Sequence, residues 1–127
     1  MNDAADLGPV IAERILRLKP DRTVTVRLGT PYTPDDFPDE SWCPYQIVGL
    51  GSSRIWRVVG IDAFQSLWLA LQSIGLALYT SEEYRAGRLH LFDNDDPDLC
   101  FPVHQSCRDL LPDWPPQRPE EAGGPAA

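Results

Sequence analysis

The chain has 127 residues, a length that suits one domain with a hydrophobic core of its own. Its 11 Lys and Arg residues against 19 Asp and Glu residues give a formal charge of −8. Nucleic acids and anionic membranes are bound chiefly through Lys and Arg. This charge therefore argues against both as direct partners and favours a basic protein partner.

The N-terminus and the cysteine content both predict a cytoplasmic protein. The first residues, MNDAADLGP, contain neither the positive region nor the apolar run of a signal peptide. The longest apolar stretch, residues 67–78, is interrupted by polar residues and is too short to span a bilayer. Three cysteines, an odd number, do not suit a disulfide framework and fit a reducing compartment.

Two strands are expected after residues 1–8, which we expect to be disordered. The apolar run Val10–Leu18 has an unsettled period: some spacings suit a helix, whereas its β-branched content and the following segment favour a strand. In Thr23–Leu28, apolar residues alternate with polar ones, which is the pattern of a half-buried strand. The intervening KPDR supplies turn chemistry, so we expect an N-terminal hairpin.

A loop and a second pair of strands follow. Residues 29–41 predict a loop, because three prolines remove backbone donors and fix φ, and the segment DDFPDE at 35–40 carries four carboxylates. Tyr45–Leu50 and Arg54–Ile61 predict two strands joined by the glycine-rich GLGSS. The second of these strands is apolar on both faces. We therefore expect it in the middle of the sheet or covered by a helix on one face.

A long amphipathic helix is predicted from Asp62 to Tyr79. Asp62 suits the N-cap, and Gln65 three residues later completes a start that resembles a capping box. Gly75 costs a helix roughly 1 kcal/mol relative to Ala, so we expect the helix to pack closely on the sheet there. Apolar residues at steps of three and four form one stripe, predicted to be core: Phe64, Leu67, Trp68, Leu71, Ile74 and Leu78.

The last part of the chain predicts a short strand and then a tail. Residues 89–92 suit a final strand, and from Pro112 onward the chain is rich in proline, with Trp114 as its exception. We predict a single α+β domain at residues 9–104, after a disordered start (1–8) and before a flexible tail (105–127). The expected fold is a mostly antiparallel sheet of four to five strands with one long helix packed on one face.

Two clusters near the C-terminus resemble metal sites without completing their patterns. Cys100, His104 and Cys107, with Cys43 as a fourth ligand, would suit tetrahedral zinc, but their spacing lacks the paired CxxC knuckle. The segment DNDDPD begins like a calcium loop, yet Asp98 stands where an EF-hand needs Gly and His104 where it needs Glu. The sequence therefore predicts a solvated acidic turn, no metal and no cofactor.

A catalytic site is not predicted either. Cys100 and His104 could in principle form a nucleophile and a base, but the sequence supplies no third group to orient them. GLGSS does not match the nucleophile elbow G-x-S-x-G and joins two strands. We therefore expect a protein that is not an enzyme.

Aromatic residues beside the acidic segment 35–40 favour recognition of a protein. Aromatic anchors ringed by carboxylates suit the capture of a cationic protein surface. The alternative, which the sequence leaves open, is that these aromatic rings fill the core of a small domain. The predicted partner-binding residues are Asp35, Asp36, Asp39, Glu40, Trp42, Tyr45 and Trp56.

The segments CPYQIVGLG and GIDAFQSLWLALQSIGLALY resemble a family of small uncharacterised bacterial domains. Its members share a CPY-x-I-x-GLG stretch and a helix start of the form G-[IV]-D-[AS]-x-Q-[AS]-L-x-LAL. The resemblance implies a shared fold and transfers no catalytic residues. The residues that carry the likeness are Cys43, Pro44, Tyr45, Gly49, Gly51, Gly60, Asp62, Gln65 and Leu69 to Leu71.

Non-catalytic protein binding is the leading function. Its most concrete form is the neutralisation of a basic toxin, since immunity proteins share this size and charge. The acidic segment 35–40 and the neighbouring aromatic residues would cover the toxin's active site, and the DNDDPD segment would contribute further charge. Two other classes remain open. One is a small metal-dependent or thiol enzyme that uses Cys100, His104 and Cys107. The other is a homo-oligomeric subunit assembled through the apolar helix face, because the sequence does not give the oligomeric state.

Overall fold

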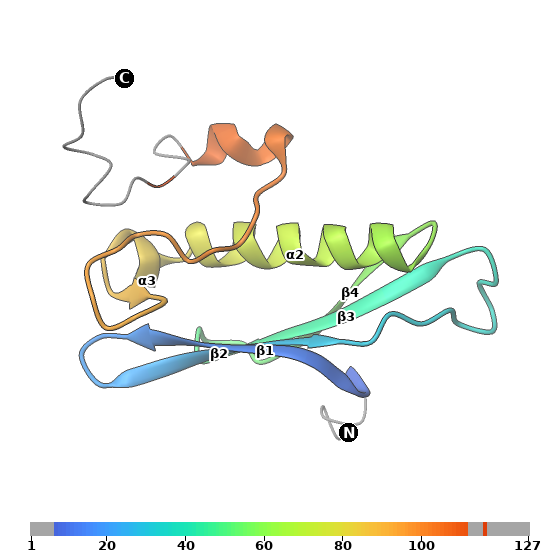
Figure 1. The fold of residues 1–127 in the computed structure, drawn as a ribbon, viewed down its shortest axis with the longest axis horizontal. Helices are drawn as coiled ribbons and strands as arrows, with labels where there is room; N and C mark the ends of the chain where they lie inside the picture. The colour runs from blue at the N-terminus through green and yellow to red at the C-terminus, as the bar shows by residue number, and fades with distance from the viewer. Residues whose placement is uncertain (1–6, 112–115, 117–127) are drawn as a thin grey trace.

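The computed structural model describes residues 7–111 and 116, and these form an α+β fold (Figure 1). The predicted class and the antiparallel sheet are confirmed. The sheet has five strands in the order β4-β3-β2-β1-β5, and every neighbouring pair is antiparallel. The strands are β1 (Val10–Leu18), β2 (Arg22–Gly29), β3 (Ser41–Val48), β4 (Ile55–Gly60) and β5 (Leu89–His90). The helices are α2 (Ala63–Tyr79), α3 (Glu82–Arg85) and the 3-10 helix η1 (Gln105–Leu110).

The first two strands form the predicted N-terminal hairpin. β1 pairs with β2 along nearly its whole length, so the ambiguous run Val10–Leu18 is a strand. In β2, Val24, Val26 and Leu28 are buried, whereas Thr25 and Arg27 between them are only partly buried. This alternation follows from the two-residue period of a strand that has one face on the core.

The other strands depart from the expected boundaries and positions. β3 begins at Ser41, four residues before the expected Tyr45, because this part of the chain is paired on both sides. On one side the N–H and C=O of Trp42 bond to the backbone of Tyr32 at 2.7 and 2.9 Å, and on the other side β4 pairs with β3. β4 is an edge strand and not a central one, and α2 covers it on one side. β5 has only two residues, shorter than the predicted 89–92. The edge position explains how β4 can keep apolar residues that are half exposed.

The start of α2 is confirmed. The Asp62 carboxylate accepts a hydrogen bond from the backbone N–H of Gln65 at 2.8 Å, as an N-cap does. The Gln65 side chain reaches back and accepts from the N–H of Ile61 at 2.7 Å, one residue before the position that a capping box uses. These two bonds fix the direction in which α2 leaves the edge of the sheet.

The predicted core stripe of α2 is wrong at two of its members. Phe64 is 86 % exposed and Trp68 is 53 % exposed. Small residues replace them on the sheet side: Ser66 and Ala70 are fully buried, and the Ser66 hydroxyl lies 2.9 Å from that of Ser41. A Cβ at Gly60 of β4 would collide with the backbone of Ser66. The helix therefore approaches β4 so closely that only small side chains fit between them.

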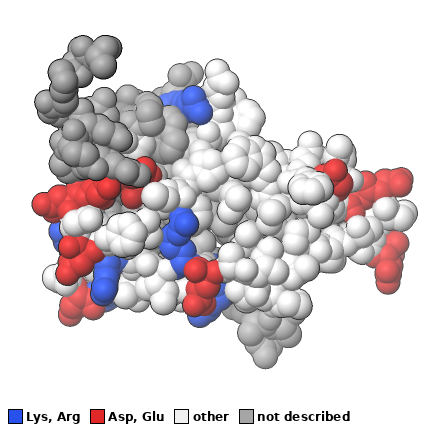
Figure 2. Space-filling model, viewed as in Figure 1, with Lys and Arg blue, Asp and Glu red and all other residues white. Residues whose placement is uncertain are grey.

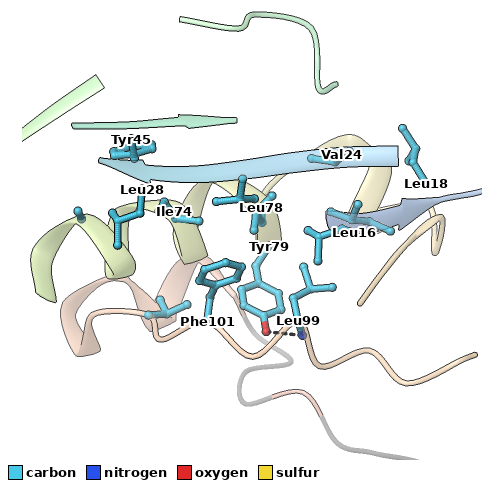
Figure 3. Close-up of a cluster of buried hydrophobic side chains, with 14 of the residues drawn as sticks. Leu16, Leu18, Val24, Leu28, Tyr45, Ile74, Leu78, Tyr79, Leu99 and Phe101 are labelled. Carbon is cyan, nitrogen blue, oxygen red and sulfur yellow. Dashed lines mark hydrogen bonds between the residues drawn. The ribbon is translucent and has the colours of Figure 1, made fainter. Parts of the chain in front are cut away.

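The segment 99–103 completes the core beside α2 (Figure 3). Gly75 packs against this segment and not against the sheet, because an added Cβ would collide with the carbonyl oxygen of Pro102. The Tyr79 hydroxyl accepts from the N–H of Leu99 at 2.9 Å. The Arg14 guanidinium donates to the carbonyl oxygen of Cys100 at 2.8 Å and lies 4.5 Å from the centre of the Phe101 ring. The segment is thus tied both to the helix and to β1.

The packed unit is longer than the predicted 9–104. Leu7 is 3 % exposed, and Cys107 and Leu111 pack against the core. Residues 105–110, predicted to belong to a flexible tail, form η1. Residues 1–6 and most of the tail, Trp114 included, lie outside the described residues. Among the described helices, none combines the length and the apolar character needed to cross a membrane.

Candidate functional site

An open hollow lies where the β2–β3 loop (residues 30–40) meets the start of α2. Three carboxyl side chains line it, and the described residues that line it include no Lys, Arg or His. We call it the acidic hollow. Its lining residues are Pro31, Tyr32, Thr33, Pro38, Asp39, Glu40, Ser41, Ile61, Asp62 and Ala63.

The β2–β3 loop is held by short-range backbone bonds that leave its carboxylates in solvent. The N–H of Phe37 donates to the carbonyl of Pro34 at 3.0 Å, and the N–H of Glu40 donates to that of Phe37 at 3.1 Å. The side chains of the aspartates in this loop are exposed. Figure 2 shows this end of the molecule as a red cluster. A fixed backbone with outward carboxylates presents negative charge with little reorganisation, which suits a cationic ligand.

Aromatic side chains of the β2–β3 loop pack against Trp42 at the start of β3. The rings of Phe37 and Trp42 stack with their centres 5.5 Å apart, and Tyr32 lies 6.2 Å from Trp42 at a tilt of 59°. The indole N–H of Trp42 donates to a Glu40 carboxylate oxygen at 2.8 Å. The guanidinium of Arg57 donates to the Tyr32 hydroxyl at 3.0 Å. The cluster therefore both orients Glu40 and leaves parts of the Tyr32 and Phe37 rings exposed, at 40 % and 46 %.

The structure divides the predicted partner-binding residues into two groups. Asp35, Asp36, Asp39, Glu40 and Trp42 lie together in or directly after the β2–β3 loop. The other two predicted residues, Tyr45 and Trp56, do not join this group.

Tyr45 was wrongly included in the predicted surface, and Trp56 belongs elsewhere. Alternate residues of a strand point to opposite faces, so Tyr45 points away from the side of Trp42 and into the core, where it is 7 % exposed. Burial raises the pKa of its hydroxyl. Trp56 pairs with Tyr45 across the strands and shares its face, with the Arg54 guanidinium 4.2 Å from its ring. These two rings cannot act with Trp42 on one ligand.

Sequence reasoning missed the contribution of the β4–α2 junction to the hollow. Asp62 was recognised as a helix cap, but nothing indicated that loop residues Asp39 and Glu40 would lie beside it. Ile61 also lines the hollow and is 77 % exposed. Phe64 and Trp68 in the first half of α2 are also exposed, and we call these three residues the apolar patch. The sequence feature that indicates this patch is the absence of any charged residue in the 17 residues of α2.

The alternative zinc set is not assembled. Cys43 lies in the core, where burial raises the pKa of its thiol from 9.0 to about 11, so it is protonated at neutral pH. Cys100 is exposed. The ring nitrogen Nδ1 of His104 accepts from the N–H of Ser106 at 3.1 Å and thereby caps η1. In the part of the chain that the structure describes, no three His, Cys, Asp or Glu residues are placed to hold a metal ion.

The aspartate loop (residues 93–98) turns its side chains toward its own backbone. Asn94, Asp96 and Asp98 each accept from the N–H two residues further on, at 3.1, 2.9 and 2.8 Å. Asp95 also forms an ion pair with Lys19 at 3.4 Å. Figure 1 places this loop beside α3, at the end of the molecule opposite the β2–β3 loop. It therefore cannot contribute to the same binding surface, contrary to expectation.

A family model matches residues 12–103, from β1 to the end of the segment that completes the core. The chain belongs to the DUF6968 family. The family is described as a domain of unknown function, in agreement with the expected uncharacterised family. The DUF6968 region includes the acidic hollow and excludes η1. No curated protein and no solved structure matches the chain.

Proposed function

We propose that this DUF6968 protein is a cytoplasmic, non-catalytic protein-binding domain that captures a basic partner at the acidic hollow. Its most concrete form is neutralisation of a bacterial toxin. The observation that carries the proposal is the meeting of Asp39, Glu40 and Asp62 around one hollow without a basic residue among its described lining. A cationic side chain entering the hollow would meet three carboxylates from two separate segments.

The surroundings of the hollow support the same chemistry. Asp35 and Asp36 extend the negative surface outward, where charges accelerate the approach of an oppositely charged protein. The partly exposed rings of Tyr32 and Phe37 offer faces on which a guanidinium or ammonium group can stack. Glu40 is held in place by the indole of Trp42, so binding needs little ordering of this side chain.

The positions of the two histidines favour binding over catalysis. His104 caps η1 and bonds to Ser106, and His90 is 7 % exposed within β5. Neither histidine lines the hollow. A general base must reach the proton that it removes. The hollow thus offers carboxylates and the ring of Tyr32, which suit the recognition of a cation.

The test is affinity capture from a lysate of the organism that encodes the protein, read by mass spectrometry and followed by affinity measurements. We compare Asp36→Asn/Asp39→Asn with Asp93→Asn/Asp95→Asn, because both double variants remove the same charge at opposite ends of the molecule. We expect a basic partner whose affinity falls at least about tenfold in the first variant and little in the second. The affinity should also fall as NaCl rises from about 50 to about 500 mM.

Two results would contradict the proposal. Equal weakening by both double variants would show that net charge, and not the hollow, attracts the partner. An affinity that does not change with salt would show that the carboxylates do not steer binding.

A further inference from the structure

The apolar patch is the least protected apolar surface among the described residues. Ile61, Phe64 and Trp68 are 77 %, 86 % and 53 % exposed. Phe64 and Trp68 are four residues apart and lie on one side of α2, and Ile61 directly precedes the Asp62 cap. The acidic hollow does not account for this exposed apolar group, because only Ile61 of the three residues lines it.

The patch is the uncovered half of a longer stripe. Phe64, Trp68, Leu71 and Gly75 follow one another at the spacing that returns to the same side of a helix. At the far end of the stripe, Gly75 packs against Pro102, and Tyr79 bonds to Leu99. The protein therefore uses the second half of this stripe for its own segment 99–103, while the described residues leave the first half in solvent.

The charge pattern selects the kind of molecule that can cover the patch. The 17 residues of α2 include no Asp, Glu, Lys or Arg, although the exposed side of a helix in a soluble protein is normally charged. Figure 2 shows white, uncharged surface next to the red cluster of the β2–β3 loop, with the Lys and Arg side chains that are in view in the other half of the molecule. A basic partner would find no counter-charge on this helix face. A second copy would meet no like charge there, in spite of the net charge of −8.

The exposed area suits a dissociable pair. If a fully exposed side chain of this size contributes about 150–250 Å², the three residues offer roughly 400 Å² per copy. A standard specific interface buries about 800 Å² per partner, including its polar rim. The patch thus supplies the apolar centre of an interface, and Gln65 and Gln72 flank it on the helix. We expect association in the micromolar range, well short of a permanent dimer.

We propose that two copies of this protein associate through the apolar patch, with their α2 helices packed antiparallel. A two-fold axis near Trp68 lets Phe64 of each copy pack on the other helix. This arrangement places the two Asp62 positions about 18 Å apart along the helices, beyond the Debye length of about 8 Å. A parallel arrangement would bring the two acidic hollows together. The antiparallel pair keeps the two hollows apart, with Ile61 of each copy at the border between hollow and interface.

The test is the mass in solution, measured by sedimentation equilibrium from about 5 to about 500 µM protein. We expect the mass to rise from 14.2 kDa toward twice that value. Phe64→Lys should stay at 14.2 kDa, whereas Phe92→Lys, the same change at a phenylalanine that is 61 % exposed, should associate like the wild type. Thermal unfolding of both variants should match the wild type, because both side chains lie largely in solvent.

The dependence on salt distinguishes self-association from the binding of a basic partner. Raising NaCl from about 50 to about 500 mM should leave self-association unchanged or strengthen it, because salt screens the repulsion between two acidic proteins. A mass of 14.2 kDa at every concentration would overturn the proposal. So would equal association of Phe64→Lys and Phe92→Lys, or a dimer that dissociates as salt rises.

Discussion

The aspartate loop and the β2–β3 loop are both rich in carboxylates and lie at opposite ends of the molecule, but their side chains bond differently. In the aspartate loop, Asp96 and Asp98 accept from backbone N–H groups two residues further on. In the β2–β3 loop, Asp35, Asp36 and Asp39 project into solvent. The first loop uses acidic residues to shape the chain, and the second presents them at the surface.

Local sequence explains this difference. A carboxylate can cap the N–H two residues on only if that residue has one. In the β2–β3 loop the residue two places after Asp36 is Pro38, which has no N–H, and the N–H of Phe37 already bonds to Pro34. In the aspartate loop every second residue from Asn94 to Asp98 accepts from the N–H two residues further on. Acidic composition alone therefore does not decide whether carboxylates cap the backbone or project into solvent; the backbone N–H groups that lie two residues further on contribute to the difference.

The largest expected effect comes from removing the last acceptor of the aspartate loop. Asp98 accepts from the N–H of Cys100 and from the Tyr79 hydroxyl, and thereby fixes the start of segment 99–103. We expect Asp98→Ala to lower the free energy of unfolding by about 2–3 kcal/mol, measured by urea denaturation. Asp36→Ala should change it by less than about 0.5 kcal/mol. Equal losses in the two variants would remove the distinction between the loops.

A smaller effect is expected in the aromatic support of the β2–β3 loop. Phe37→Ala removes the ring stacked on Trp42 at 5.5 Å, and we expect a loss of stability of about 1 kcal/mol. Acrylamide should then quench tryptophan fluorescence more strongly, because the indole of Trp42 becomes more exposed. Phe92→Ala is the control at an exposed ring in the other half of the molecule. If it caused the same increase in quenching, the stacking would have no specific role.

The smallest effect concerns the backbone that leaves the aspartate loop. Cys100 has φ 59°, a left-handed conformation that favours glycine. Its side chain is exposed, so Cys100→Gly should raise the stability by about 0.5 kcal/mol, after allowance for the greater freedom of glycine in the unfolded chain. Cys100→Val should lower it by about 1 kcal/mol, because a β-branched residue tolerates this φ poorly. Thermal unfolding of the two variants should therefore shift in opposite directions.

Much of the fold could be predicted because its signals are local. The alternation in β2 and the cap formed by Asp62 and Gln65 each depend on residues close together in the chain. The edge position of β4 could not be predicted, since the apolar faces of Trp56 and Val59 look the same in a central strand. The same applies to Phe64 and Trp68, whose expected place on the sheet is taken by Ser66 and Ala70.

The site was harder to predict than the fold, because it joins distant segments. The acidic segment 35–40 was identified by composition, but its meeting with Asp62 depends on the direction of α2 at the sheet edge. The error at Tyr45 has a simpler cause. Trp42 and Tyr45 are three residues apart, and an odd spacing in a strand places two side chains on opposite faces. The expected strand began at Tyr45, whereas β3 begins at Ser41 and includes both residues. A strand predicted from Ser41 would therefore have separated the two side chains.

The bonds between Arg14 and the backbone of segment 99–103 have a consequence for synthesis of the protein. The chain leaves the ribosome with its four longest strands first, each able to pair with its neighbour. The hydrogen bond from Arg14 to Leu99 joins residues 85 positions apart, so one side of the core stays open until almost the whole domain has been made. A nascent chain halted before Leu99 would expose apolar residues of β1 and β2, and such surface makes incomplete chains prone to aggregation.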